Sequence, residues 1–282
     1  MNTPSPSATP TGSTGSTYAL GHADVEVQRL LLQGRLYNHH TEHALRLAGL
    51  RPGMRVLDIG SGPGDVSFVA AKLVGPTGGV LGVDAAPEMV ELARARAAEM
   101  GLPTARFVHG AIDEVVPDEQ VDAVIGRLIL MHLPDPVATL RRLASFVRPG
   151  GVVAFSENDM TATRSIPDLP LFDQVTAGIV RAFETMGLSA RFGTTLHQVF
   201  ADAGLGTPRL TQGTPIGTAA DTDMLEYAAE VWRLVSPIAQ QAGFAIDGLT
   251  DLDEFVPRFR HEALAANAVF TMPSMITAWV RK

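Results

Sequence analysis

The part of the sequence with the clearest chemical meaning contains three regularly spaced glycines, Gly60, Gly62 and Gly64, and two acids, Asp58 and Asp84. Residues 56–66 read VLDIGSGPGDV, and residues 80–84 read VLGVD. The pattern predicts a strand, a glycine turn, a helix start and a second strand that ends in an acid. A ligand can contact the backbone of such a turn because glycine has no β-carbon. Asp84 follows Gly64 by 20 residues, about where dinucleotide sites place the acid that binds ribose hydroxyls. The segment therefore predicts a site for an adenosine-containing ligand.

The glycine spacing narrows the type of ligand. Gly60, Gly62 and Gly64 follow G-x-G-x-G rather than G-x-G-x-x-G, and the P-loop signature is absent, which disfavours a phosphate site. Five ordered segments then resemble successive motifs of the class I S-adenosylmethionine (SAM)-dependent methyltransferases, over roughly residues 50–160. They read VLDIGSGPG, VLGVDAAPEMVELAR, FVHGAID, VDAVIGRLILMHLPDP and LRRLASFVRPGGVVAFSE. The alternative is a glycine turn that serves only strand–helix packing.

The resemblance implies that SAM is the cofactor and that S-adenosylhomocysteine (SAH) is released. Asp58 would orient the turn or bind the ammonium group of the donor, or it could merely cap the turn. Asp84 would accept hydrogen bonds from both ribose hydroxyls, or else cap the next helix. The complete set of expected cofactor-binding residues is Asp58, Gly60, Ser61, Gly62, Gly64, Asp84, Ala85, Met89, Ala111, Ile112, Arg127 and Gln33.

The third segment departs from the family pattern. Many relatives place an aspartate after its glycine to receive the adenine amino group, whereas Ala111 and Ile112 follow Gly110 here. The adenine could be held by the backbone of Ala111 and by packing on Ile112, or by Asp113. After the fourth strand, Arg127 lies where the family's backbone carbonyl often meets the donor's amino group. Its side chain could bind a substrate carboxylate or remain exposed.

Four residues are candidates for catalysis. His132 could take a proton from the acceptor, because imidazole titrates near pH 6.5, or it could only hydrogen-bond its loop. Either Glu157 or Asn158, at the end of a strand, could orient the acceptor, and Glu157 could act as a base if burial raised its pKa. It could also be a solvated loop acid. Tyr18, in a segment similar to the lid of small-molecule relatives, could lie against the sulfonium or anchor that segment. His39 is the fourth candidate, with a plain helix-surface position as its alternative.

The apolar periodicity predicts the elements that position these residues. Strands alternate with helices from residue 55 to residue 156, which predicts a doubly wound α/β fold. By the resemblance, the sheet has seven mostly parallel strands and ends in an antiparallel pair from residues 207–218 and 267–281. Two short helices are expected between residues 24 and 50. The expected organisation is a disordered tail at 1–17, a helical lid at 18–50, a SAM-binding Rossmann-like core at 51–160, and at 161–282 a helical cap plus the terminal strands.

Composition limits the partners and the compartment. The 282 residues include no cysteine, which excludes disulfides and thiolate metal sites within them. A formal charge of −8 disfavours nucleic acid, which requires a basic face. No apolar run reaches the roughly 20 residues that span a bilayer, so no membrane partner is expected. Histidine spacing gives no support to a metal site. A cytoplasmic location is expected, and a homodimer is possible.

These observations predict methyl transfer to a small secondary-metabolite acceptor, aromatic or heterocyclic, through an oxygen, nitrogen or carbon nucleophile, with an indole among the options. The alternative is a descendant that binds SAM without methylating, as a cyclase or with a structural use of the cofactor. The intact glycine turn does not distinguish the methyltransferase from the non-methylating descendant, because both would bind SAM. Candidates for an aromatic substrate wall, each of which could instead belong to the core, are Tyr37, Phe155, Phe172, Phe192, Tyr227, Trp232 and Phe270.

Overall fold

A seven-stranded sheet forms the centre of the protein, with strand order β3-β2-β1-β4-β5-β10-β7. The computed structural model describes residues 15–244, 246 and 252–282. Strands β1 to β5 pair in parallel, and β10 runs antiparallel to both of its neighbours. The predicted seven-stranded, mostly parallel α/β sheet is thereby confirmed. Its strands are β1 (Arg55–Ile59), β2 (Gly79–Asp84), β3 (Ala105–His109), β4 (Val121–Arg127), β5 (Val147–Asp159), β7 (Arg209–Gly213) and β10 (Ser274–Arg281).

Helices cover both faces of this sheet, as a doubly wound fold requires. Helices α2 (Asp65–Val74) and α3 (Pro87–Glu99) pack on one face with the end of α1. Helices α4 (Pro136–Ser145) and α6 (Phe192–Asp202) pack on the other. The central strands β1 and β4 are buried at nearly all positions, because helices cover both of their sides. The carboxyl ends of β1, β2, β4 and β5 therefore meet at one edge, where ligands of such folds bind.

Helix α1 (Gly15–Ala48) is continuous over 34 residues, so the prediction of two short helices was wrong. The expected break lay at Tyr37-Asn38-His39-His40, and two of these residues have partners that the sequence did not reveal. Tyr37 is buried and donates to the carbonyl of Pro273 at 2.8 Å, and Asn38 donates to Asp65 at 3.3 Å. Residues 1–14 of the predicted tail lie outside the described residues, and its last three residues begin α1.

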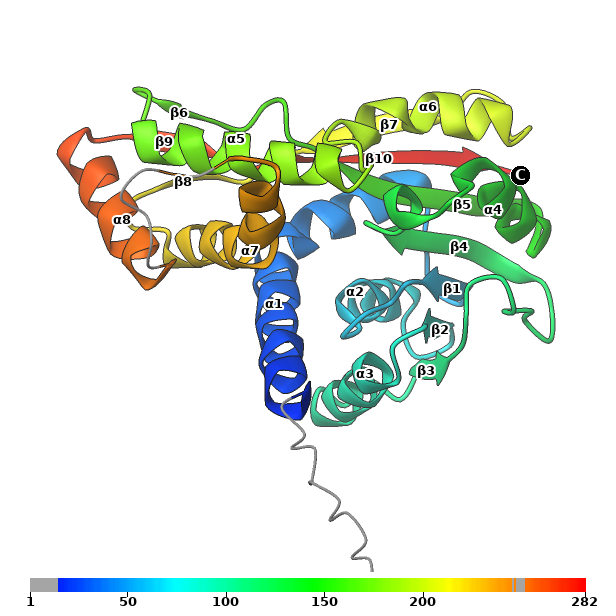
Figure 1. Cartoon of the computed structure of the whole chain (residues 1–282). Helices are drawn as coiled ribbons and strands as arrows, with labels where there is room; N and C mark the ends of the chain where they lie inside the picture. The colour runs from blue at the N-terminus through cyan, green and yellow to red at the C-terminus, as the bar shows by residue number, and fades with distance from the viewer. Residues whose placement is uncertain (1–14, 245, 247–251) are drawn as a thin grey trace, which may run out of the picture.

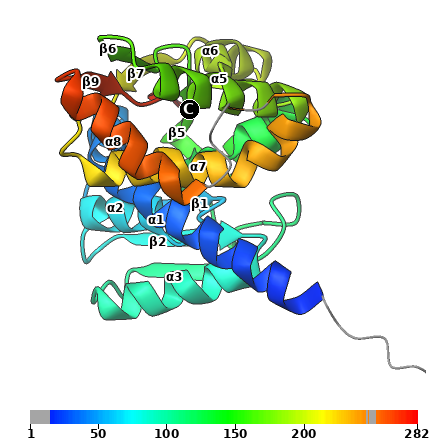
Figure 2. The same cartoon turned by 60° about the vertical axis from the view of Figure 1, so that its left-hand side comes forward.

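A cap stands beside the sheet and is built from α5 (Pro170–Thr185), α7 (Thr222–Gln241) and α8 (Phe255–Ala265). Figure 1 shows the cap on the left and the sheet on the right, and Figure 2 shows α1 crossing between the cap helices and α3. A three-stranded sheet of order β6-β9-β8 completes the cap. Its strands are β6 (Arg164–Ile166), β8 (Ile216–Thr218) and β9 (Val269–Thr271), and single turns of 3-10 helix form η1 (Leu130–His132) and η2 (Leu252–Glu254).

The small sheet was not predicted, because each expected terminal strand is divided between two sheets. Residues 207–218 contribute to β7 and β8, and residues 267–281 contribute to β9 and β10. The divisions fall next to Pro215 and Pro273, which cannot donate to a strand ladder. The expected antiparallel end of the main sheet is nevertheless present in β10 and β7.

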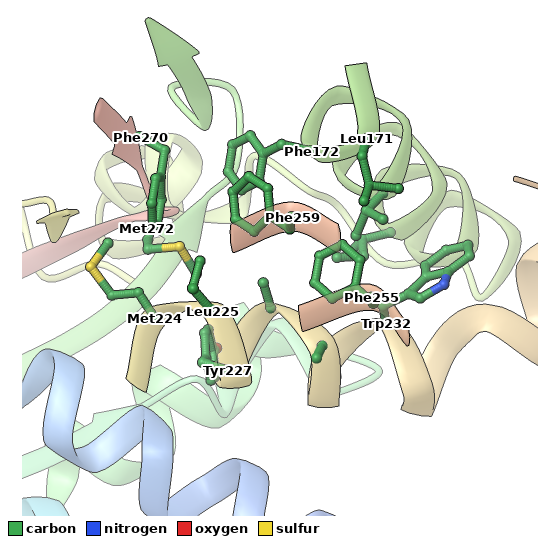
Figure 3. Close-up of a cluster of buried hydrophobic side chains, with 14 of the residues drawn as sticks. Leu171, Phe172, Met224, Leu225, Tyr227, Trp232, Phe255, Phe259, Phe270 and Met272 are labelled. Atoms are coloured by element: carbon green, nitrogen blue, oxygen red, sulfur yellow. The ribbon is translucent and has the colours of Figure 1, made fainter. Parts of the chain in front are cut away.

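The interior of the cap is rich in phenylalanine. Phe259 on α8 lies between three other rings, stacked on Phe172 at 5.0 Å and on Phe255 at 5.7 Å, and tilted against Phe270 at 5.2 Å between ring centroids. All four side chains are buried, and Figure 3 shows them between α5, α7 and α8. This core holds α5 and α7 in fixed positions beside the edge of the sheet.

Candidate functional site

One large cavity of about 700 Å³ lies where the carboxyl edge of the sheet faces α1, α5 and α7. A volume of this size falls within the usual range for small-molecule sites. Predicted site residues that line it are Gly60, Gly62, Asp84, Met89, Arg127, His132 and Gln33. The cavity thus joins residues from four strands and loops of the sheet with residues from α1 that are distant in sequence.

The glycine turn and Asp84 form one end of the cavity. The Asp84 carboxylate accepts from the backbone N–H of Gly62 at 2.7 Å and of Ala86 at 2.9 Å. Gly62 has a φ of +51°, and the position that a side chain would take there is open space. A carboxylate has about four acceptor positions, so two remain for a ligand. The turn therefore offers exposed backbone and an anchored acid side by side.

Two buried polar groups behind this turn fit a cofactor with a cationic amino group. The Asp58 carboxylate accepts from the Ser67 hydroxyl at 2.6 Å through Oδ2, while its Oδ1 has no partner. The Ser61 hydroxyl is also buried without a partner. Burial raises the pKa of Asp58 to about 7, against the opposing hydrogen bond from Ser67. A cation at this place would stabilise the ionised form, so the residues present suit the ammonium group of SAM.

Arg127 is buried, which contradicts the option of an exposed side chain. Its Nη1 donates to Asn38 Oδ1 at 3.1 Å and to Thr41 Oγ1 at 2.9 Å, both on α1. Burial lowers its pKa, while Asp65 and Asp58 act in the opposite direction. Arginine stays protonated at neutral pH, so β4 carries a positive charge into the cavity wall.

The adenine contact is the least supported part of the predicted donor site. Ala111 is exposed, and neither it nor Ile112 lines the cavity. Ala85 also lies outside the lining, although its neighbour Ala86 belongs to it. Asp58, Ser61 and Gly64 are likewise outside the lining. All of the cofactor-binding assignments remain predictions. Gln33 is buried and accepts from Arg29 at 2.7 Å, so α1 covers the cavity with side chains already held in place.

The catalytic candidates separate into different places. His132 lines the cavity, and burial together with the charge of Arg29 lowers its pKa. His39 is exposed and lines a different surface hollow, and its ring is tilted against that of His40 with 3.8 Å between the ring centroids. Helix α1 turns His39 away from the cavity, which fits its alternative, a plain helix-surface position. Of Tyr18, only the backbone position in α1 is described, so its assignment remains a prediction.

Glu157 is neither a solvated acid nor part of the cavity lining. Its Oε1 accepts from the backbone N–H of Ile129 at 3.0 Å and of Leu130 at 2.7 Å, and its Oε2 is buried without a partner. These contacts give Glu157 a positioning role, while its predicted role as a base or in orienting the acceptor stays a prediction. Glu157 holds η1, the turn that carries His132, against the end of β5.

The burial of Glu157 predicts a dependence of stability on pH. Desolvation raises its pKa from 4.5 to about 8, so the native state keeps a proton that the unfolded chain releases. The free energy of unfolding should therefore fall as pH rises from about 5 to about 8, by at most about 1.4 kcal/mol per pH unit for this group. Asp58 adds a fall of the same sign up to about pH 7. Urea denaturation of Glu157→Gln should show a weaker dependence than the wild type, with Glu114→Gln as the exposed control. An equal dependence in all three proteins would contradict the assignment.

The apolar half of the cavity was only partly foreseen. Of the seven aromatic candidates, Phe172 and Tyr227 line the cavity, and Phe183 joins them. Tyr37, Phe155, Trp232 and Phe270 are buried core residues, and Phe192 packs against the core under α4 and α6. Most of the wall is aliphatic or methionine: Leu30, Met131, Met160, Val175, Ile179, Met186, Leu188, Val231, Leu234, Val235, Ile238 and Met272. The amphipathic pattern of α5 and α7 indicated their buried faces but not that a cavity lay between them.

Comparisons with known proteins agree with this geometry. A family model for a methyltransferase domain matches residues 50–186. An arsenite methyltransferase from Aquipseudomonas alcaligenes is 31% identical over 208 residues, which cover 71% of this chain and 57% of that protein. A demethylmenaquinone methyltransferase from Staphylococcus aureus is 34% identical over 130 residues, which cover 46% of this chain and 51% of that protein. The matched segments thus span about half the length of these two curated relatives.

A solved structure shows the same fold at low sequence identity. The YcgJ protein from Bacillus subtilis superposes with a TM-score of 0.52 at 18% identity, over 86% of this chain and 99% of that chain. No helix in the part of the chain that the structure describes has the length and hydropathy needed to cross a membrane. The matched segment contains the glycine turn, Asp84 and the five parallel strands. The chain therefore contains a class I SAM-dependent methyltransferase domain.

Proposed function

We propose that the protein transfers a methyl group from SAM to a small, largely apolar organic acceptor that binds between α5 and α7. The observation that carries this proposal is the continuity of one cavity. The glycine turn and Asp84 form one end, and the aliphatic wall of the cap forms the other. A donor at the turn would direct its methyl group toward that wall. Phe172, Phe183 and Tyr227 offer ring faces, which favours an aromatic or heterocyclic acceptor.

SAM supplies a methyl group on a positively charged sulfur, which is already activated for transfer. The protein therefore has to bind and orient the donor and the acceptor and to exclude water from them. These effects can supply most of the rate acceleration. Asp84 and the turn fix the donor, and the apolar wall excludes water from the acceptor. Because the pKa of His132 is lowered, its imidazole is neutral at pH 7 and can take a proton from a hydroxyl or amine nucleophile.

An organic acceptor suits the chain better than arsenite, which the name of one relative specifies. Trivalent arsenic is a soft centre, and soft centres prefer thiolate ligands. The 282 residues contain no cysteine. The apolar wall offers no replacement for thiolates, whereas it suits a hydrocarbon ring. A quinol or another phenolic ring is thus a better first probe than arsenite.

Methyl-labelled SAM and a panel of phenols, quinols and indoles provide the test. Mass spectrometry would measure SAH and the methylated product together, and equal amounts of both are expected. Ile179→Phe, which fills part of the acceptor half, should raise the KM for the acceptor while leaving SAH affinity unchanged. Conversion of an acceptor without SAH release would overturn the proposal in favour of a non-methylating use of the cofactor.

Replacement of His132 should mainly affect the proton-transfer step. For an acceptor whose nucleophile must lose a proton, His132→Gln is expected to lower kcat by about 100-fold or more, with little change in SAH affinity. The kcat of the wild type should rise with pH through an apparent pKa below 6.5, because burial lowers the pKa of this imidazole. His197→Gln, on the exposed side of α6, is the matched control. An unchanged pH profile in His132→Gln would remove the imidazole from the mechanism.

A further inference from the structure

We propose that Arg127, together with Asn158, binds a carboxylate inside the cavity, on the side of the sheet that faces α1. This inference rests on the proposed function, because it assumes that the donor or the acceptor enters the cavity. The carboxylate could belong to the methionyl part of SAM or to the acceptor. The chemistry of recognition is the same for both sources, and the experiment below separates them.

Arg127 carries a buried charge that the described residues do not neutralise. It is 8% exposed, and the two hydrogen bonds of its Nη1 end on the neutral side chains Asn38 and Thr41. Two acids influence its pKa, but neither is recorded in an ion pair with it. Asp65 forms an ion pair with Arg96 at 2.9 Å, and Asp58 accepts from Ser67 at 2.6 Å through Oδ2, while its Oδ1 has no partner. A buried cation without a paired anion is costly, and a bound anion would offset that cost.

Arg29, another arginine of the cavity wall, differs from Arg127 because its charge has a partner. Arg29 on α1 also lines the cavity, but its guanidinium binds both carboxylate oxygens of Glu26, at 2.8 and 2.7 Å. Its charge is therefore already balanced. Arg127 still has guanidinium donors beyond Nη1 for a planar acceptor, and a carboxylate matches that fork.

Asn158 is a second, independent indication of a polar ligand at the same place. It lines the cavity, and its buried Oδ1 has no hydrogen-bond partner. Arg127 on β4 pairs with Ser156 on β5, and Asn158 lies two residues farther along β5. Side chains two residues apart in a strand point to the same face. Arg127 and Asn158 therefore lie on the same face of neighbouring strands, and a rotated Asn158 amide presents its NH₂ group as a further donor.

The experiment measures binding by calorimetry with four probes. SAH carries the amino-acid carboxylate, and 5′-methylthioadenosine has the same nucleoside and thioether without it. Likewise, 3-phenylpropanoate carries a carboxylate on an apolar ring, and its methyl ester does not. Arg127→Gln removes the charge, and Arg127→Lys keeps it without the planar fork. Arg46→Gln, at an exposed arginine of α1 outside the cavity lining, is the matched control. Thermal melting of each variant with and without 5′-methylthioadenosine reports whether the cavity is still formed.

If Arg127 binds the carboxylate of the donor, Arg127→Gln should weaken SAH binding by about 10- to 100-fold. It should leave 5′-methylthioadenosine unchanged, and Arg127→Lys should restore part of the SAH affinity. If the acceptor supplies the carboxylate, the same variant should abolish the preference for 3-phenylpropanoate over its ester and leave both nucleosides unchanged.

If Arg127→Gln lowers the affinity for all four probes equally, Arg127 only joins α1 to the sheet, and the inference is overturned. A loss of carboxylate binding of the same size in Arg46→Gln would overturn it as well. If the wild type binds neither SAH nor 5′-methylthioadenosine, the proposed function fails. If the wild type binds both and Arg127→Gln binds both equally well, only the inference about Arg127 fails.

Discussion

Replacement of Asp84 by alanine is expected to weaken SAH binding by about 100-fold or more while the protein remains folded. The side chain lies at the end of β2 and is held by the N–H groups of Gly62 and Ala86. A ribose would add two hydrogen bonds to the same carboxylate. Hydrogen bonds to a charged group contribute about 1.5–3 kcal/mol each, and 1.4 kcal/mol corresponds to a tenfold change in affinity.

Calorimetric titration with SAH measures this loss, and Asp84→Asn refines it. The amide keeps the size of the side chain but loses the charge and one acceptor, so its affinity should fall between those of the wild type and the alanine variant. Asp118→Asn, at an exposed acid in the loop after β3, controls for net charge. SAH affinity in Asp84→Ala equal to that of the wild type would disprove the ribose contact.

Replacement of Phe259 by alanine should cause the largest loss of stability in the cap. Its ring contacts three buried phenylalanine rings at once, and removal of a buried phenylalanine costs about 3–5 kcal/mol. Phe172, one of these three, also lines the cavity. Acceptor affinity should therefore fall with stability, whereas the donor turn, which belongs to a separate core, should change less.

Urea denaturation measures the stability, and binding of SAH monitors the donor turn in the same preparation. Leu264→Ala is the matched control, because Leu264 lies on the same helix and is 65% exposed. Its unfolding free energy should change by about 0.5 kcal/mol or less. Similar losses of unfolding free energy in Phe259→Ala and Leu264→Ala would mean that the stacked rings do not specifically stabilise the cap.

The donor half of the protein could be predicted from the sequence because its signals are local. The turn from Gly60 to Gly64, the acid at Asp84 and the alternation of strands with helices each occupy a few neighbouring residues. The fold then brings them to one edge by the rule that governs parallel sheets. The seven-stranded sheet and the antiparallel position of β10 followed from the same resemblance and are confirmed.

The acceptor half could not be predicted because its contacts join distant segments. Nothing near Glu157 in the sequence indicates that its carboxylate meets the N–H groups of Ile129 and Leu130. The burial of Arg127 likewise depends on Asn38 and Thr41, more than 80 residues earlier. The polar run at residues 37–40 therefore suggested a break in a helix. In the folded protein Tyr37 instead hydrogen-bonds Pro273, and Asn38 hydrogen-bonds Asp65 and Arg127.

The continuity of α1 has a consequence for the binding of both ligands. Its first part lines the cavity through Arg29 and Gln33, and its middle holds Arg127. Gly34, between these parts, lies so close to Asp65 that a β-carbon would approach the carboxylate to 2.4 Å. The covering part cannot shift far without straining contacts on the donor side. Both ends of the cavity are thus covered by one helix that is already held in place, so a variant that displaces α1 should weaken the binding of donor and acceptor together.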